Sequence, residues 1–461
     1  MGTGRGCASY NQTLENGAGR LKSLVSQRHY LSVLLFILAA KALFWSWSLA
    51  VGHWFPLSPL KYFATGHHYT IDPRITEHRV DFFTLWTYAD SEWYLSIAEH
   101  GYPNTDEMNK AAAARKARTG FPYAFSPGDP AARYRKYTEW DNDAKYAFFP
   151  LYPLSIALFR LILPLDVAAF VATNAISTLA FLGVYALAFA YFSDKGLAFR
   201  SLALLVFYPF SVFYQAYFAE GLFLLLAVLS LYFLKKGKPG FAVLCAALFV
   251  LTKPNGVLIV IPLLILALKQ SAPAQTRAEK RADKLGRKSK TAWRIDWSKA
   301  RVLCLAPLGL VPILLLDYFN TGQWTYFTVA QRRWAHQPTA FLENLLRNIF
   351  LTGSKFFRLR LLSDGDCQVD YAMMAVVLLI LVLSYRRLPL ELWSFSALLW
   401  LTPLVSKDLM SFSRYMSVSF PLFLYLAGRM KRKLVFGAVL GCFLAGSLVI
   451  DGRMVTWHWV G

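Results

Sequence analysis

The chain has 461 residues, of which 56% are hydrophobic, 16% aromatic and only 16% charged. Soluble proteins average roughly 25% charged residues, so this composition excludes a disordered or fibrous chain and argues against a soluble globular enzyme. The net charge is +22, but the basic residues gather in short linkers between apolar runs, which is typical of a polytopic membrane protein and not of a nucleic-acid-binding one. The five cysteines include no Cys-x-x-Cys pair and predict neither a disulfide framework nor a zinc site.

The N-terminal tail, residues 1–29, is polar and precedes the first apolar run, residues 30–51. Arg20, Lys22 and Arg28 lie just before this run, which predicts a cytoplasmic tail by the positive-inside rule. The run is long enough to span a bilayer and has no small-residue cleavage site in the usual place. We therefore expect an uncleaved first membrane helix and not a signal peptide.

A long, mostly polar stretch, residues 53–147, follows the first span and is the expected first extracytoplasmic loop. A connection of this length is uncommon and is usually functional. Within it, residues 86–100 have helical periodicity that places Trp86, Asp90 and Trp93 near one face. Because an amphipathic aromatic helix beside a membrane tends to lie at the interface, a carboxylate is expected at the membrane–water boundary.

Further apolar runs predict the remaining spans. They are residues 167–192, 201–214, 220–234, 241–251, 257–268, 302–316, 371–384, 392–405, 415–426 and 434–450. Placing the basic linkers inside, with a cytoplasmic loop at 269–301 and a second extracytoplasmic loop at 319–345, gives roughly eleven transmembrane helices. The expected fold is therefore all-α, with residues 30–461 forming one polytopic domain. If the apolar segment 148–164 also crossed the membrane, every later basic linker would change sides. We therefore interpret this segment as a half-membrane or shallow helix.

The first outer loop carries the candidate chemistry. Transfer of a sugar from a lipid phosphate to a hydroxyl needs a base for the acceptor proton, and the phosphate leaving group needs cationic partners. Asp81 and Asp90 are the carboxylates considered for the base. The alternatives are that Asp90 caps its helix or pairs with an arginine, and that Asp81 is a solvated loop charge. The rings of Trp86, Trp93 and Tyr94 suit the apolar faces of a sugar.

Six short motifs occur in collinear order from about residue 80 onward. They are DSEWYLSIAEHGY at 90–102, YAFFPLYP at 146–153, FYPFS with FAEGLF at 207–223, LTKPNG at 251–256, TGQ with AQ and Trp334 at 321–334, and SRY with FPLF at 413–423. Together this series resembles the GPI mannosyltransferase 2 (PIG-V-like) family, in the GT-C class of integral-membrane glycosyltransferases. Two positions depart from the family pattern, because Ala89 replaces a Trp and Gly221 replaces a small hydroxyl residue.

The resemblance implies a GT-C-like fold and an inverting transfer of a hexose, with mannose as the first expectation. The implied partners are a polyprenyl-phosphate sugar donor, a glycan or lipid acceptor hydroxyl outside the cytoplasm, and membrane lipid. Because no nucleic-acid module or metal-ligand spacing is present, we expect no nucleic acid, no cofactor and no metal. Asp90 matches the family's loop carboxylate and is the expected general base, with Asp81 as the second choice. Glu220 matches a carboxylate at a helix start, and its alternative role is to pair with a nearby cation.

Four basic residues are candidates to hold the donor phosphate, since arginine offers bidentate contacts to phosphate oxygens. Lys253 and Arg414 lie at helix edges, and Arg332 and Arg333 lie in the second outer loop. For Arg414 the alternative is a helix-end side chain that reaches toward the interface. The letters of Asp141-Asn142-Asp143 resemble a D-x-D metal site, but we expect no metal there.

Two other functions stay open at the level of sequence. A transporter or flippase of lipid-linked saccharides predicts charges buried in mid-helix and carboxylates along a central pore, whereas an enzyme predicts carboxylates at one outer membrane edge. A structural subunit without activity is the other alternative. The expected location is a prokaryotic plasma (inner) membrane in preference to the endoplasmic reticulum.

Overall fold

The described part of the chain is helical. The computed structural model describes residues 5–55, 82–110, 142–268, 303–331, 343–344, 346–348, 368–405, 409, 411–456, 458 and 460. Side chains are described from residue 29 onward, except at 142, 143, 368 and 405. Every regular element in these ranges is an α-helix or a 3-10 helix, and they contain no strand. The all-α prediction is therefore confirmed for the described residues.

Three helices are long and apolar enough to cross a membrane: the His29–Trp54 part of α1 (Arg5–Trp54), α7 (Leu165–Phe192) and α21 (Lys433–Val455). At 1.5 Å per residue, 23 residues extend about 35 Å, which matches the hydrocarbon thickness of a bilayer. Much of the surface of α21 is apolar and exposed. A surface of this kind belongs in lipid, so we describe the chain as an integral membrane protein.

The other helices are shorter than a full span, so the expected eleven crossings are not confirmed. They are α8 (Lys195–Val206), α9 (Glu220–Lys235), α10 (Pro239–Val250), α11 (Val260–Leu268), α14 (Val311–Thr321), α17 (Gln368–Ser384), α18 (Leu390–Leu401) and α20 (Phe420–Arg429). Several apolar runs are divided by 3-10 helices that contain proline, namely η6 (Pro254–Ile259), η7 (Ala306–Leu310) and η10 (Thr402–Val405). Proline lacks the backbone N–H that a continuous α-helix needs, which explains the breaks.

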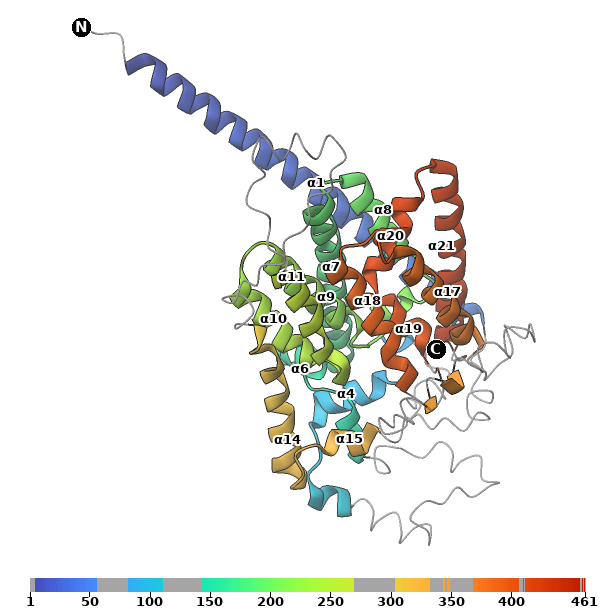
Figure 1. Cartoon of the computed structure of the whole chain (residues 1–461). Helices are drawn as coiled ribbons and strands as arrows, with labels where there is room; N and C mark the ends of the chain where they lie inside the picture. The colour runs from blue at the N-terminus through green and yellow to red at the C-terminus, as the bar shows by residue number, and fades with distance from the viewer. Residues whose placement is uncertain are drawn as a thin grey trace.

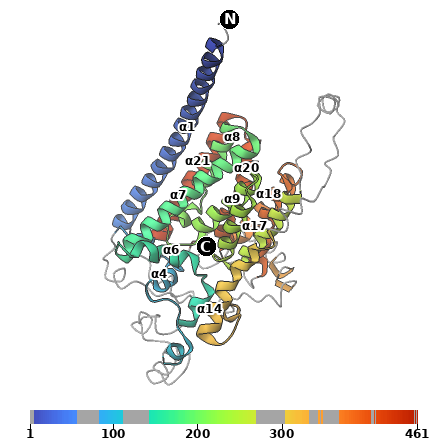
Figure 2. The same cartoon turned by 90° about the vertical axis from the view of Figure 1, so that its left-hand side faces the viewer.

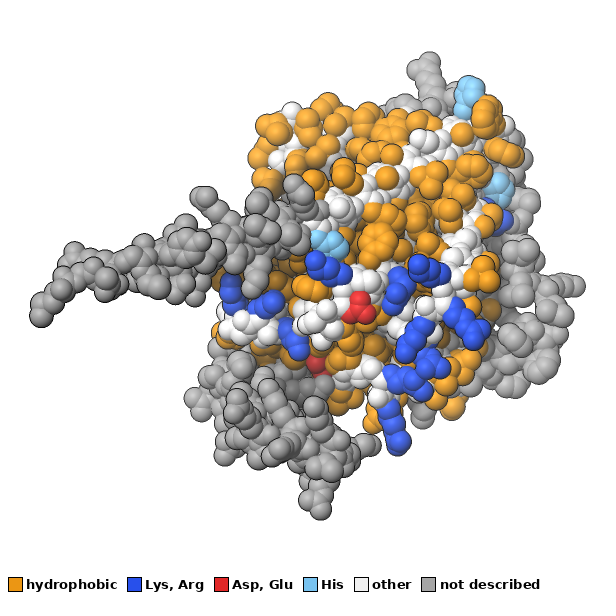
Figure 3. Space-filling model, turned by 90° about the horizontal axis from the view of Figure 1, so that it is seen from above, with side chains coloured by type: hydrophobic (Ala, Val, Ile, Leu, Met, Phe, Trp, Pro, Cys, Tyr) orange, Lys and Arg blue, Asp and Glu red, His pale blue; other side chains and the backbone are white. Residues whose placement is uncertain are grey.

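One face of the molecule is strongly basic. The turns between α7 and α8, between α9 and α10, between α17 and α18 and between α20 and α21 carry exposed basic side chains: Lys195, Lys235, Lys236, Lys238, Arg386, Arg387, Arg429, Lys431, Arg432 and Lys433. Seen from above, Lys and Arg side chains gather over this face (Figure 3). The positive-inside rule predicts that this is the cytoplasmic face.

The outer-loop elements lie at the opposite end. They are η1 (Thr84–Trp86), α4 (Ser91–His100), η4 (Asn142–Ala147), α6 (Leu151–Arg160) and α15 (Tyr326–Gln331). In two perpendicular views α4, α6 and α14 occupy the lower end and α8 the upper end (Figures 1 and 2). The 10 residues of α6 reach about 15 Å, which agrees with a half-membrane helix.

The expected helix over residues 86–100 begins only at Ser91. Ala89 has φ +46°, in the left-handed region, and this separates η1 from α4. A non-glycine residue seldom adopts this conformation unless the surrounding structure holds it there.

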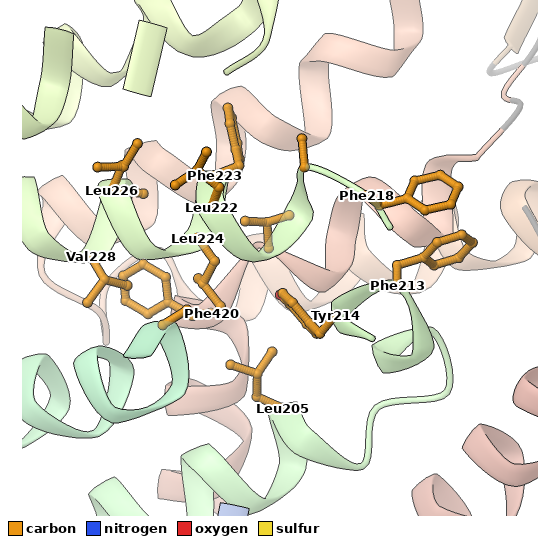
Figure 4. Packing of buried hydrophobic residues seen from close by; sticks show 14 of the residues in the cluster. Leu205, Phe213, Tyr214, Phe218, Leu222, Phe223, Leu224, Leu226, Val228 and Phe420 are labelled. Atoms are coloured by element: carbon orange, nitrogen blue, oxygen red, sulfur yellow. The ribbon is translucent and has the colours of Figure 1, made fainter. Parts of the chain in front are cut away.

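The core lies where α9 meets the segment before it and α20. Buried side chains of α9 pack with Leu205, Phe213, Tyr214 and Phe218, and with Phe420 at the start of α20 (Figure 4). α9 also packs closely on α7, because a Cβ on Gly221 would lie 3.2 Å from the Cβ of Ser177. This close approach gives a physical reason for glycine directly after Glu220.

The orientation can be tested with single cysteines in an otherwise cysteine-free chain. We expect Gly237→Cys, in the basic turn after α9, to react with a membrane-impermeant maleimide only after the cytoplasmic side is opened. Asp106→Cys, on the exposed part of the first outer loop, should react in intact cells. The reverse labelling pattern would overturn the assignment of the two faces.

Candidate active site

Asp90 forms an ion pair with an arginine far away in the sequence. Its Oδ2 lies 3.0 Å from Nη1 of Arg414, which donates the hydrogen bond. The side chains are 14% and 9% exposed, respectively. Although Asp90 occupies the N-cap position of α4, its carboxylate caps no amide of that helix in the described structure. Of the two structural alternatives for Asp90, the arginine pair is the one observed.

Backbone contacts hold the segment before Asp90 in place. The carbonyl oxygen of Trp86 accepts a hydrogen bond from the Tyr217 amide at 3.2 Å, and the Tyr217 hydroxyl donates to the Phe83 carbonyl at 2.8 Å. The Ser91 hydroxyl also donates to the Trp86 carbonyl. Since Tyr217 lies three residues before Glu220, these bonds bring the outer loop to the start of α9.

Glu220 and Lys253 form a second ion pair beside the first. Oε1 of Glu220 lies 2.7 Å from Nζ of Lys253 and 3.4 Å from Nε of Arg414. Glu220 is 1% exposed and begins α9, where the helix dipole favours a negative charge. Lys253 follows α10 in an extended conformation, as expected for a residue before proline. Two carboxylates and two cations therefore meet at one point, which we call the charge cluster.

Aromatic rings surround the two cations. The guanidinium carbon of Arg414 lies 5.5, 5.1 and 5.3 Å from the ring centres of Phe213, Phe218 and Tyr415. Nζ of Lys253 lies 5.3 Å from the Tyr415 ring. Cation–π contacts are stronger where water is excluded, and burial also makes charge pairing essential. The cluster is thus a compact, largely dehydrated group of alternating charges.

Tyr94 adds a hydroxyl on α4. Burial raises the pKa of Tyr94 well above its usual value, and the charges of Glu220 and Asp90 raise it further. The hydroxyl therefore keeps its proton at physiological pH and stays a hydrogen-bond donor.

The structure brings together four of the residues selected from the sequence: Asp90, Glu220, Lys253 and Arg414. They come from four separate motifs and meet at the ends of α9 and α10 that lie away from the basic turns. α9 is 16 residues long, so Glu220 lies about 24 Å from the end of that helix at the basic face.

The aromatic candidates pack within the protein. Trp93 stacks on Phe148 with ring centres 5.9 Å apart, and Tyr94 meets Phe148 and Tyr152 edge-on. Trp86 is 0% exposed, so its ring offers no free face to a sugar in this structure.

Several other sequence predictions fall outside the described residues. Asp81, Arg332, Arg333 and Asp141 are in this group, and so are the side chains of Asn142 and Asp143. Among the residues that the structure describes, no group of three or more His, Cys, Asp or Glu side chains could hold a metal ion.

Sequence reasoning missed the aromatic residues around the cations. Tyr415 directly follows Arg414, and Phe213 and Phe218 lie within the motif that contains Glu220. These aromatic residues could have been selected from the sequence, because they lie in the same motifs as the charged residues.

Comparisons with known proteins give little further information. No family model matches the sequence, and no curated protein matches it. A crystal structure of the Archaeoglobus fulgidus oligosaccharyltransferase, tethered to an acceptor peptide containing the NVT sequon, is similar with a TM-score of 0.38 and 12% sequence identity. The similarity covers 93% of this chain and 55% of that chain, so the chain spans about half the length of that protein. At this level the similarity supports no functional assignment.

The Glu220–Lys253 pair can be tested by a double-mutant cycle. Glu220→Gln should lower the thermal stability of the purified protein more than Lys253→Met does, because it leaves two cations without this carboxylate. Breaking a buried pair costs about 3–5 kcal/mol. The double variant should lose less than the sum of the single losses, with a coupling of about 0.5–3 kcal/mol. Lys238→Met on the exposed basic face is the control, and additive losses would contradict the pairing.

Proposed function

We propose that the chain is an integral-membrane glycosyltransferase of the GT-C class that moves a hexose from a polyprenyl-phosphate donor to an extracytoplasmic hydroxyl. The observation that carries the proposal is the Asp90–Arg414 pair beside Glu220–Lys253, at the helix ends opposite the basic face. The resemblance of the motif series to the PIG-V-like family makes mannose the first sugar to test. The proposed base is Asp90, and the proposed phosphate ligand is Arg414, while Lys253 stays paired with Glu220.

The proposed reaction is a single inverting displacement. The acceptor oxygen attacks the anomeric carbon of the donor sugar, and the bond from that carbon to the phosphate oxygen breaks. Asp90 takes the hydroxyl proton, and the polyprenyl phosphate leaves with the electron pair of the broken bond. A guanidinium can contact two phosphate oxygens at once, so Arg414 is suited to stabilise the leaving group.

Arg414 must exchange partners for this chemistry, because it holds Asp90 in the observed state. A donor phosphate on Arg414 would compete with Asp90 for the guanidinium, while Glu220 would keep Lys253. A carboxylate that no longer pairs with a cation is free to accept a hydrogen bond from an acceptor hydroxyl. Donor binding would therefore convert Asp90 from an ion-pair partner into a base.

The neighbouring surface suits a lipid-linked substrate. α6 packs against α4, whose N-terminus carries Asp90. Leu154 and Leu158 of α6 are exposed, and so are Leu161 and Ile162 in the turn that follows. A short helix with exposed apolar side chains at this end of the bundle is expected to lie in the membrane interface. A polyprenyl tail would lie along α6 while its phosphate reaches the charge cluster.

The placement of carboxylates favours an enzyme over a transporter of lipid-linked saccharides. Besides Asp90 and Glu220, the buried Asp317, Asp370 and Asp451 lie near the outer ends of α14, α17 and α21, whereas the buried Glu391 lies at the basic end of α18. An outer edge rich in carboxylates was the pattern expected for an enzyme, and a row along a pore was the pattern expected for a carrier.

Removing the proposed base should abolish transfer. We expect Asp90→Asn to lower kcat by roughly 10²–10⁴-fold, the usual contribution of general base catalysis. The measurement is transfer of labelled sugar in vesicles supplied with polyprenyl-phosphate mannose, polyprenyl-phosphate glucose or a nucleotide sugar. Asp106→Asn, an exposed carboxylate of the same loop, is the control. Full activity of Asp90→Asn would show that Asp90 is not the base, and transfer from the nucleotide sugar alone would reject the lipid donor.

Competition between Asp90 and the phosphate for Arg414 predicts that Asp90→Asn, although inactive in transfer, binds the phosphate more tightly. Asp90→Asn should bind farnesyl phosphate roughly five- to tenfold more tightly than the unchanged protein, because the carboxylate no longer competes with the ligand for Arg414. Arg414→Gln should weaken that binding. Equilibrium titration of the purified protein measures both effects. Weaker binding by Asp90→Asn would mean that the carboxylate helps to hold the phosphate and does not compete with it.

A further inference from the structure

The short helix that carries Arg414 depends on contacts with other elements for its position. α19 (Phe412–Ser417) has 6 residues, and isolated helices of this length are not stable in water. The preceding residue, Ser411, has φ +64°, in the left-handed region, and its side chain caps no amide within the described residues. The direction of the Arg414 side chain therefore depends on contacts from other elements.

Asp370 makes the contact at the start of this helix. It lies in the first turn of α17 and is buried. Its Oδ1 accepts a hydrogen bond from the Ser413 amide at 2.7 Å. A carboxylate from another helix thus takes the place of a local N-cap side chain. The amide that it holds belongs to the residue directly before Arg414.

Two tyrosines hold the carbonyl groups of the same helix. The Tyr208 hydroxyl donates to the Ser413 carbonyl at 3.2 Å, and the Tyr214 hydroxyl donates to the Ser417 carbonyl at 2.9 Å. Both tyrosines are buried and lie between α8 and α9. The peptide groups on either side of Arg414 are therefore held by side chains of two other parts of the bundle.

We propose that Asp370 is a positioning residue for the phosphate-binding guanidinium of Arg414, with Tyr208 completing the support at Ser413. This inference rests on the proposed function, in which Arg414 holds the donor phosphate. Small displacements of a group that binds the reacting phosphate cause large losses in transfer. Asp370 acts only through Arg414, by fixing the backbone from which that side chain extends.

A positioning role requires an acceptor oxygen at residue 370, whereas simple stabilisation of the fold does not. A buried charge is a poor way to stabilise a fold, since an apolar residue of similar volume is often as good or better. What the carboxylate adds is an acceptor oxygen directed at the Ser413 amide. Asparagine has an oxygen in the same place, so Asp370→Asn should preserve the position of Arg414, and Asp370→Ala should not.

The experiment compares Asp370→Ala and Asp370→Asn with Glu391→Ala, which removes a buried carboxylate at the basic end of α18. We expect Asp370→Ala to raise the donor KM and the Kd for farnesyl phosphate by about tenfold or more, with the acceptor KM unchanged. Asp370→Asn should stay within about twofold of the unchanged protein in both constants. Glu391→Ala should lower the melting temperature without changing either constant.

The outcomes separate this inference from the proposed function. If the unchanged protein neither transfers sugar nor binds farnesyl phosphate, the proposed function fails. If binding depends on Arg414 but Asp370→Ala keeps the original Kd and KM, only the positioning role fails. Equal impairment of Asp370→Asn and Asp370→Ala would also overturn that role. Should Asp370→Ala not fold, Tyr208→Phe removes the other support at Ser413, and an unchanged donor KM in that variant would reject the inference.

Discussion

The guanidinium of Arg414, shared between Asp90 and Glu220, is the interaction on which the arrangement of the outer end depends. It joins the first outer loop to the start of α9 and to the segment before α20. Because charges that leave water must find partners, each of these segments can reach its place only if the others do. Lys253 balances the second carboxylate and fixes the end of α10 at the same point. Ion pairing in a dehydrated region thus connects parts of the chain that are up to 324 residues apart.

The distribution of charge also separates the two ends of the molecule by function. On one face, exposed Lys and Arg side chains outnumber the acidic side chains in the turns (Figure 3). Water and anionic lipid headgroups can solvate these cations. At the other end cations and carboxylates alternate and are buried. Only the second arrangement offers cations that an incoming anion can take over from a carboxylate. This difference, more than the number of charges, is why the outer end is the candidate for phosphate chemistry.

The sequence predicted several of the helices, but not how they meet. The run 220–234 corresponds to α9 and the run 167–192 to α7, because long apolar periods bounded by polar residues define a helix locally. The run 201–214 was expected to be one span, yet α8 ends at Val206. A turn that contains Pro209 and the 3-10 helix η5 (Ser211–Tyr214) follow it. Asp90 and Arg414 were each selected from their motifs, but their contact depends on the packing of the whole bundle. The burial of Trp86 likewise comes from tertiary packing, which periodicity cannot show.

The two carboxylates of the charge cluster differ in ways that assign them different tasks. Glu220 is almost fully buried and faces two cations, which stabilise its negative charge and hold it in place. Asp90 is more exposed, and the cation with which it pairs is the one best shaped to bind phosphate. In the proposed mechanism, a ligand that binds Arg414 frees Asp90 and leaves Glu220 paired with Lys253. An anionic lipid carrier would in this way expose a base at the moment when an acceptor hydroxyl can use it, while the permanent pair keeps the site assembled.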